Sequence, residues 1–161
     1  MKDIREIKRL ASPMPKPQSL AWDGSTLWVG SRETRRVYAL DPATLAIRWE
    51  CAAPGVPYGM TVVDGGELRV LCSETANDNR IIRACIPRMG FDANFALACP
   101  DDTGSQLSYD GQRLHVSQWY PKKVVRLSRD GGVERVIQAP RGICGPRRES
   151  WRPISTRWRS R

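Results

Sequence analysis

Four carboxylates in two polar stretches are the side chains of this 161-residue chain best suited to hold a metal ion. Glu74 and Asp78 lie in one stretch, and Asp101 and Asp102 lie side by side in the next. Carboxylate and amide oxygens are the ligands that calcium prefers in proteins. We therefore treat Glu74, Asp78, Asp101 and Asp102 as candidate ligands of a divalent cation such as calcium. The alternative is that both stretches are solvated polar loops.

A second group of side chains is suited to binding a flat organic ligand. Trp119 and Tyr120 follow Gln118 directly. Their rings can stack on a sugar while the amide of Gln118 hydrogen-bonds to it. Aromatic rings at the end of a strand also serve in packing, so both interpretations stay open.

The histidine count restricts the remaining chemistry. His115 is the only histidine, so a Ser-His-Asp triad would have to use it, and a zinc site with several histidines is excluded. The glycine pairs at 65–66 and 131–132 stand in expected hairpins and match neither a Walker loop nor a Rossmann pattern. We assign no catalytic residue.

A sequence motif that occurs three times predicts the strands and turns that position these groups. It consists of two short apolar runs joined by an Asp-Gly turn, and it stands at 20–29, 60–70 and 107–116. Asp-Gly favours a hairpin, because glycine adopts positive φ and aspartate bonds its own turn backbone. Its aspartates, Asp23, Asp64 and Asp110, recur at a spacing of roughly 40–50 residues, which is typical of β-propeller blades.

We therefore expect an all-β chain of about three four-stranded antiparallel blades, which is an incomplete propeller ring, since a closed one has about four to eight blades. A lead-in segment covers 1–16, and the blades cover about 17–53, 54–99 and 100–139. A fourth blade starts at 140–145, and a basic tail, disordered or out of frame, covers 146–161. The expected strands are 18–22, 26–31, 37–40 and 46–51; 58–63, 67–73, 80–86 and 95–99; and 106–109, 113–118, 123–127 and 133–137.

Burial between blades is expected for apolar residues of these strands and for His115. The expected core residues are Trp22, Trp28, Val29, Val62, Leu68, Val70, Leu114 and Val116.

Strand direction selects one face of the blades for binding. Strands alternate in direction, so the loop that enters each blade emerges beside the loop between its second and third strands. Ligands usually bind at that face, and the Asp-Gly turns lie on the opposite one, where we expect them to be structural. The candidate ligand-binding residues at the binding face are Gln18, Tyr58, Glu74, Asn77, Asp78, Asp101, Asp102, Gln106, Gln118 and Trp119. Further polar residues of the same loops are Arg32, Glu33, Asn79, Thr103 and Arg141.

The recurring motif, in which a strand begins with Pro-x-x-Leu or Pro-x-x-Met and closes on Asp-Gly, resembles the six-bladed propellers of the senescence marker protein/gluconolactonase and NHL-repeat group. The stretch at 37–42 resembles a strand of the same proteins, and the resemblance covers about 17–143. It implies a divalent metal in the channel, held by a glutamate of the first blade and by later Asn and Asp residues. The matching stretch here, 16–19, contains no carboxylate.

The function that we expect is that of a binding or interaction module for an unassigned ligand. The alternative is a metal-dependent lactonase-type hydrolase, with Asp78, Asp101 or Asp102 as metal ligand or base. A small molecule or a protein is the expected partner at the channel face, and two copies of the chain can close a six-bladed ring with twofold symmetry.

Charge and cysteine usage bear on the compartment. The formal charge is +9, and the stretch 146–161 holds six arginines against one glutamate. Such a tail suits nucleic acid or an acidic membrane, but we expect neither partner. The N-terminus lacks the apolar run of a signal peptide, and the five cysteines form no Cys-x-x-Cys pair. We expect a cytoplasmic protein.

Overall fold

The computed structural model describes residues 6–74 and 79–139, which form three four-stranded antiparallel sheets. The first sheet holds β1 (Pro17–Trp22), β2 (Leu27–Ser31), β3 (Arg36–Leu40) and β4 (Ile47–Ala52). The second holds β5 (Val56–Val62), β6 (Leu68–Ser73), β7 (Arg80–Ile86) and β8 (Gly90–Ala98). The third holds β9 (Gln106–Tyr109), β10 (Leu114–Gln118), β11 (Lys123–Leu127) and β12 (Val133–Gln138). Two short 3-10 turns, η1 (Asp64–Gly66) and η2 (Pro100–Asp102), complete these elements.

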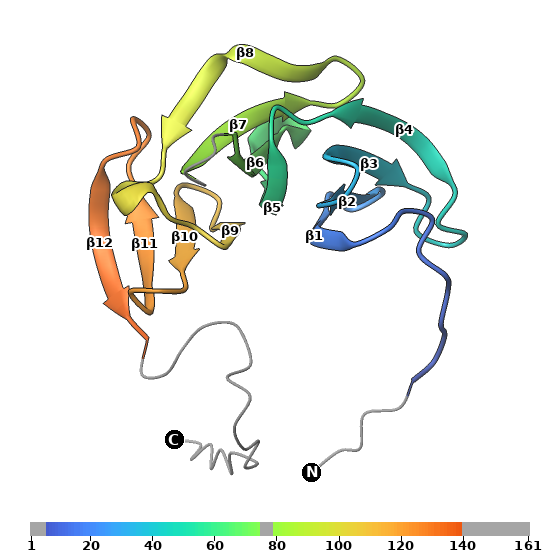
Figure 1. The fold of residues 1–161 in the computed structure, drawn as a ribbon, viewed down its shortest axis with the longest axis horizontal. Coiled ribbons are helices and arrows are strands. Elements are labelled where there is room, and N and C mark those ends of the chain that lie inside the picture. Colours follow the sequence, from blue (N-terminus) through green and yellow to red (C-terminus); the bar gives the residue numbers. More distant parts are fainter. Residues whose placement is uncertain (1–5, 75–78, 140–161) are drawn as a thin grey trace.

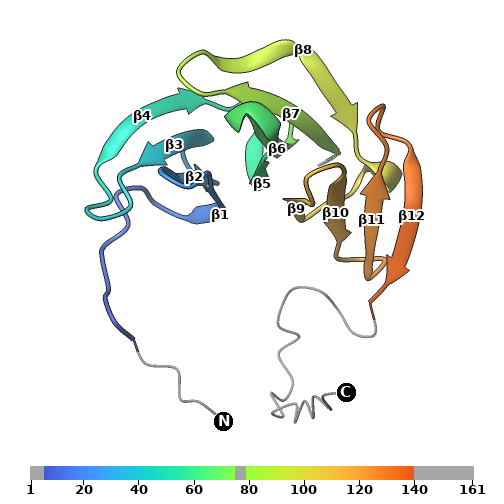
Figure 2. The same cartoon turned by 180° about the vertical axis from the view of Figure 1, so that it is seen from behind.

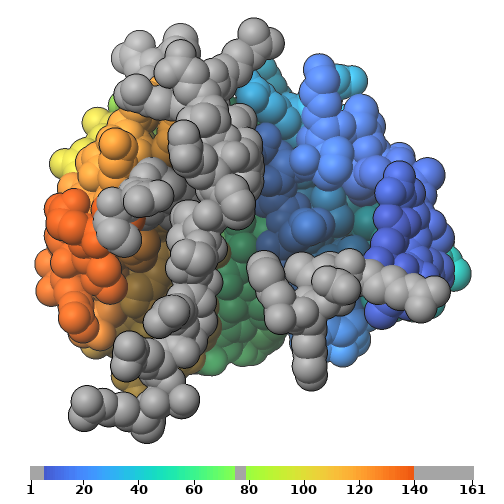
Figure 3. Space-filling model, turned by 90° about the horizontal axis from the view of Figure 1, so that it is seen from below, coloured from blue at the N-terminus to red at the C-terminus, as the bar shows by residue number. Residues whose placement is uncertain are grey.

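The three sheets stand side by side as the blades of a β-propeller. Figures 1 and 2 show them along an arc, with β1, β5 and β9 on its inner side and β4, β8 and β12 on its outer side. Seen from the open side of the arc, the blue first blade and the orange third blade lie at opposite ends, with the second between them (Figure 3). The all-β, blade-by-blade prediction is therefore confirmed in these residues.

Most strand predictions match the structure closely, and those at 80–86, 106–109 and 123–127 match at both ends. The prediction for β8 was wrong, because the strand begins at Gly90 rather than at residue 95 and ends before Cys99. A tight turn, in which the Met89 amide donates to the Ile86 carbonyl, lets pairing with β7 start at once.

The first and second blades meet through an apolar layer. Trp28, Val37 and Ala39 of the first blade pack against Met60 and Val70 of the second. Trp49 of β4 extends this layer outward, and its ring meets that of Trp28 edge to face at a centroid distance of 6.0 Å. These residues alternate with others that point away, as the period of two in a strand requires.

A second apolar layer joins the second and third blades. Leu71 and Ile82 of the second blade pack against Leu107, Val116 and Val125 of the third. The inner strands approach closely here, since a Cβ added to Gly59 of β5 would lie 2.7 Å from the Cα of Gln106. Glycine at this position allows the backbones of β5 and β9 to touch.

Two core predictions were wrong. Both concern the face of the first blade that points away from the second blade, which we call its outer face. Val29 is buried there, against Met14, Tyr38 and Leu40, and not between blades. Trp22 is 53% exposed, because it pairs with Leu27 and shares the outward side of β1 and β2.

The lead-in segment covers part of this outer face. Its described part, 6–16, contains neither helix nor strand. The Ser31 hydroxyl donates to the Pro15 carbonyl at 2.6 Å, and the Arg32 amide donates to the Lys16 carbonyl at 3.1 Å. These bonds hold Met14 against the first blade, where it is 4% exposed.

His115 does not lie between the second and third blades. It stands between Leu114 and Val116 on β10, which pack toward the second blade, so it belongs to the other side of the sheet. Its Nε2 lies 3.8 Å from the Oδ2 of Asp110.

The expected start of a fourth blade and the basic tail lie outside the described residues. In the part that is described, no helix has the length and apolar character needed to cross a membrane.

Candidate functional site

A cavity of about 520 Å³ opens where the loop that enters the third blade meets residues of β1, β5 and β7. We call it the mouth cavity. It is lined by Gln18, Arg32, Tyr58, Arg80, Thr103, Gly104, Ser105, Gln106, Trp119 and Tyr120. Gln18, Tyr58, Gln106 and Trp119 are ligand-binding candidates from the sequence, and all four line this one cavity.

Tyr58, on β5, lies at the centre of the lining. The guanidinium carbon of Arg80 lies 3.7 Å from the centre of its ring, and that of Arg32 lies 5.9 Å away. The Nε of Arg80 donates to the Gly104 carbonyl at 3.1 Å, which ties β7 to the loop that enters the third blade. Stacked guanidinium groups hold a tyrosine ring in a defined orientation and add positive charge beside it.

Gln106 connects the two inner strands beside Tyr58. Its Nε2 donates to the Tyr58 carbonyl at 3.4 Å, and its backbone amide donates to the Ser117 hydroxyl at 3.1 Å. The amide side chain of Gln18 reaches the same cavity from β1. Two carboxamides therefore offer donors and acceptors to a polar ligand.

Trp119 and Tyr120 form the other wall. Their ring centres lie 4.9 Å apart, with an interplanar angle of 38°. Both side chains are exposed at the turn between β10 and β11.

Gln118 lies beside this wall but is fully buried and does not line the cavity. Its Nε2 donates to the carbonyls of Pro100 and Thr103, the latter at 2.9 Å. These bonds fasten η2 to β10. The structure thus places Gln118 as the support of the loop that carries Thr103 to the cavity.

The candidate metal ligands are not brought together in the described residues. Both oxygens of Glu74 accept from Arg83, at 2.6 and 2.7 Å, and Asp101 accepts from Lys123 at 2.8 Å. Asp101 and Asp102 both have left-handed backbone in η2, and neither lines the mouth cavity. No group of three His, Cys, Asp or Glu residues suited to a metal occurs within 6–74 and 79–139.

Three of the expected residues cannot be placed. Asn77, Asp78 and Arg141 lie outside the described residues, so the metal prediction that uses Asp78 stays a prediction.

Sequence reasoning missed Arg80. It was placed only as the first residue of the strand expected at 80–86, and that strand begins at the binding face. Arg80 and Tyr58 belong to β7 and β5, which are separated by β6, so no pattern of adjacent residues in the sequence signalled their contact.

The mouth cavity combines aromatic surface, amides and cationic groups. Among the lining residues that the structure describes, none is an aspartate or a glutamate. Arg32 is exposed and makes no ion pair with a described residue. The described lining can therefore hold a polar ligand that carries hydrogen-bond acceptors or a negative charge.

No protein-family model matches the chain, and no curated protein sequence matches it. Several solved structures are similar to it. Glutaminyl cyclase of Myxococcus xanthus aligns with a TM-score of 0.62 at 17% identity, over 76% of this chain and 53% of the other. Aldose sugar dehydrogenase of Streptomyces coelicolor, in its PQQ-bound form, aligns with 0.60 at 13% identity, over 79% and 48%. Virginiamycin B lyase of Staphylococcus aureus, solved with quinupristin, aligns with 0.58 at 15% identity, over 81% and 44%.

These similarities show a β-propeller fold. At such identities they carry the fold alone, since one propeller fold hosts unrelated functions. The chain spans about half the length of these structures.

Proposed function

We propose that this chain is a propeller binding module whose mouth cavity holds a small ligand with a flat, sugar-like ring and an anionic group. The observation that carries the proposal is that one cavity is lined both by Tyr58 with Arg80 and Arg32 over its ring and by the Trp119–Tyr120 pair. A cavity of about 520 Å³ is also within the size range of small-molecule sites.

Each wall has a separate task in this proposal. The face of a sugar ring lies against Trp119, because aromatic rings bind the apolar face of a flat ligand. The Arg32 guanidinium meets the anionic group, since its planar fork matches a carboxylate. Gln18 and Gln106 hydrogen-bond to the hydroxyl groups.

The test is a fluorescence titration of the full chain with glucuronate, and with glucose as the neutral counterpart. We expect saturable quenching by glucuronate and binding of glucose that is about tenfold weaker, the loss of one charged pair. Arg32→Gln should weaken glucuronate to the level of glucose.

Trp119→Phe should remove the fluorescence response, whereas Trp22→Phe should keep it, because Trp22 is also exposed but does not line the cavity. Equal binding of both sugars, or quenching that survives Trp119→Phe, would contradict the proposal.

The alternative function is the metal-dependent lactonase-type hydrolysis that the gluconolactonase resemblance implies. Glu74 and Asp101 are each bound to a basic side chain, which favours the binding module over this alternative. A rise in melting temperature with added calcium would favour this alternative, because an ion that binds only the folded state stabilises it.

A further inference from the structure

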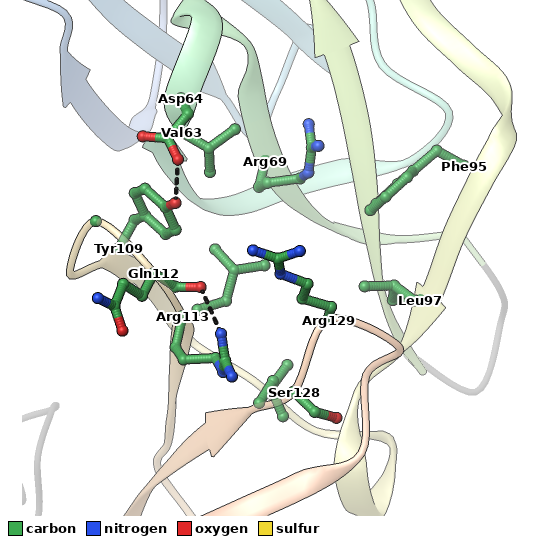
Figure 4. A pocket seen from close by; sticks show the side chains of 13 residues that line it. Val63, Asp64, Arg69, Phe95, Leu97, Tyr109, Gln112, Arg113, Ser128 and Arg129 are labelled. Atoms are coloured by element: carbon green, nitrogen blue, oxygen red, sulfur yellow. Dashed lines mark hydrogen bonds between the residues drawn. The ribbon is translucent and has the colours of Figure 1, made fainter.

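A second cavity, of about 450 Å³, lies on the opposite face between the second and third blades. We call it the turn-face cavity. It is lined by Val63, Asp64, Arg69, Phe95, Leu97, Tyr109, Gly111, Gln112, Arg113, Leu114, Leu127, Ser128 and Arg129 (Figure 4). It shares no residue with the mouth cavity.

The cavity arises from a difference between the two blade interfaces. Trp28 and Arg69 each stand five residues after the turn aspartate of their blade. At the first interface Trp28 packs against Trp49, whereas at the second the guanidinium of Arg69 lies 4.4 Å from the ring centre of Phe95. A slender cationic side chain thus replaces an indole, and the interface is left open beside it.

The turn aspartates also differ in their partners. Asp23 accepts from the Trp28 indole of its own blade at 2.7 Å, but Asp64 accepts from the Tyr109 hydroxyl of the next blade at 2.6 Å. This bond forms one side of the cavity in Figure 4. The hydrogen bond between Asp64 and Tyr109 thus connects the second and third blades at this face.

Three guanidinium groups surround the cavity, and one of them lacks a carboxylate. Arg69 pairs with Glu67 at 2.8 Å, and Arg113 pairs with Glu134 at 2.7 Å. Arg129 is exposed and has no ion pair with any residue of 6–74 and 79–139. In Figure 4 its side chain lies between Arg113 and the Phe95–Leu97 wall.

The remaining lining is largely apolar. Phe95 and Leu97 of β8 face Leu114 and Leu127 of the third blade across the interface. Covering this apolar wall with an aryl or branched alkyl group removes apolar surface from water, which lowers the free energy of the complex.

We infer that the turn-face cavity binds a small organic monoanion, a carboxylate carried on an aryl or branched apolar group. The carboxylate pairs with the fork of Arg129, and the apolar group lies against Leu97 and Phe95. The guanidinium of Arg129 and the apolar wall together select this class over neutral aromatic compounds and over inorganic anions.

The test uses the full chain with phenylacetate as probe, followed by nuclear magnetic resonance of the backbone amides. We expect saturable shifts at 111–114 and 128–129. Phenylacetamide, the neutral counterpart, and inorganic phosphate should each bind about tenfold more weakly or worse, because each lacks one of the two recognised parts.

Arg129→Gln should weaken phenylacetate about tenfold, and Arg135→Gln, which removes the same charge from an exposed position of β12 outside the cavity, should leave it unchanged. Arg129→Lys keeps the positive charge but lacks the planar fork, so its affinity for phenylacetate should lie between those of the wild-type chain and Arg129→Gln. Equal affinity of the Arg129→Gln variant would overturn the inference. So would a response that follows Trp119 fluorescence, because that places the probe in the mouth cavity.

Discussion

The indole Nε1 of Trp28 donates a hydrogen bond of 2.7 Å to the Oδ2 of Asp23. The other carboxylate oxygen accepts from the backbone amides of Ser25 and Thr26, at 2.8 and 2.7 Å. One side chain thus closes the first hairpin and orients a tryptophan of the layer between the first two blades. The turn aspartate of the first blade therefore connects the hairpin turn to the core.

Asp23→Ala should lower the free energy of unfolding by about 1–3 kcal/mol, because it leaves the Trp28 donor and two turn amides without their acceptor. Asp110→Ala is the matched control. Asp110 accepts from the amides of Gln112 and Arg113 but has no tryptophan partner. Asp110→Ala should therefore lower the free energy of unfolding by less than Asp23→Ala does. Denaturant unfolding measures both, and equal losses would show that the indole bond contributes nothing.

The same carboxylate should make stability depend on pH at the acid end. Burial acts to raise the pKa of Asp23, but the hydrogen bonds from Trp28, Ser25 and Thr26 outweigh it and lower that pKa from 3.8 to about 2. A carboxyl with a lowered pKa in the folded state stabilises the protein above pH 3.8, and this contribution is lost as the pH falls towards 2. Melting temperatures should therefore fall less steeply across this range in Asp23→Asn than in the wild-type chain.

The blade pattern could be predicted because it depends on local chemistry. Asp-Gly turns and alternating apolar residues are sequence properties, and they located the hairpins around Asp23, Asp64 and Asp110. The side of the sheet that each residue faces was harder. Trp22 and Trp28 are both aromatic residues of one hairpin, yet only Trp28 faces the second blade, because the two occupy opposite sides of their strands.

For the candidate site, the sequence predicted the face of the blades but not the pairing of the charged side chains. Strand direction placed Gln18, Tyr58 and Trp119 at one face, and they do line one cavity. The basic partners of the carboxylates could not be predicted from strand direction. Glu74 is bound by Arg83 from the adjacent strand, and such a pairing depends on the register of β6 and β7 and on side-chain rotamers. Arg80 was missed for the same reason.

Cys51 should be the most reactive of the four cysteines in the described residues. Its Sγ lies 3.8 Å from that of Cys85, and the hydrogen bond between the thiols lowers the pKa of Cys51. Burial raises the pKa values of Cys72 and Cys99 to about 12. Because the thiolate is the nucleophile, iodoacetamide should modify Cys51 first.

Peptide mapping by mass spectrometry checks this order and separates these cysteines from Cys144. Cys85→Ala should slow the modification of Cys51, since it removes the thiol whose hydrogen bond lowers the pKa of Cys51. An unchanged rate in that variant, or faster labelling of Cys72, would contradict the prediction.

The contact between β5 and β9 should be intolerant of added volume. Gly59→Ala places a methyl group 2.7 Å from the Cα of Gln106, an atom of the backbone that cannot rotate away. We expect destabilisation of about 1–3 kcal/mol, the usual cost of overpacking. Gly132→Ala is the control, because the nearest atom there is the rotatable hydroxyl of Ser128. Similar melting temperatures for both variants would argue against the close approach of the inner strands.

The outer face of the first blade bears on assembly. Leu20 is 63% exposed and Trp22 53% exposed, and both lie on the side of β1 that faces away from the second blade. Between the described blades this kind of surface is covered by a neighbouring blade. Exposed apolar patches of this kind mark interaction surfaces.

We expect a second copy of the chain to cover this face, so that two arcs of three blades close one ring by twofold symmetry. Light scattering should then give the mass of a dimer. Leu20→Glu combined with Trp22→Glu should yield a monomer, because it places two charges in the contact. Met89→Glu, at an 81% exposed position in the turn between β7 and β8, should leave the dimer intact. A wild-type chain that scatters as a monomer would refute the closed ring, whereas dissociation by Met89→Glu would place the contact elsewhere.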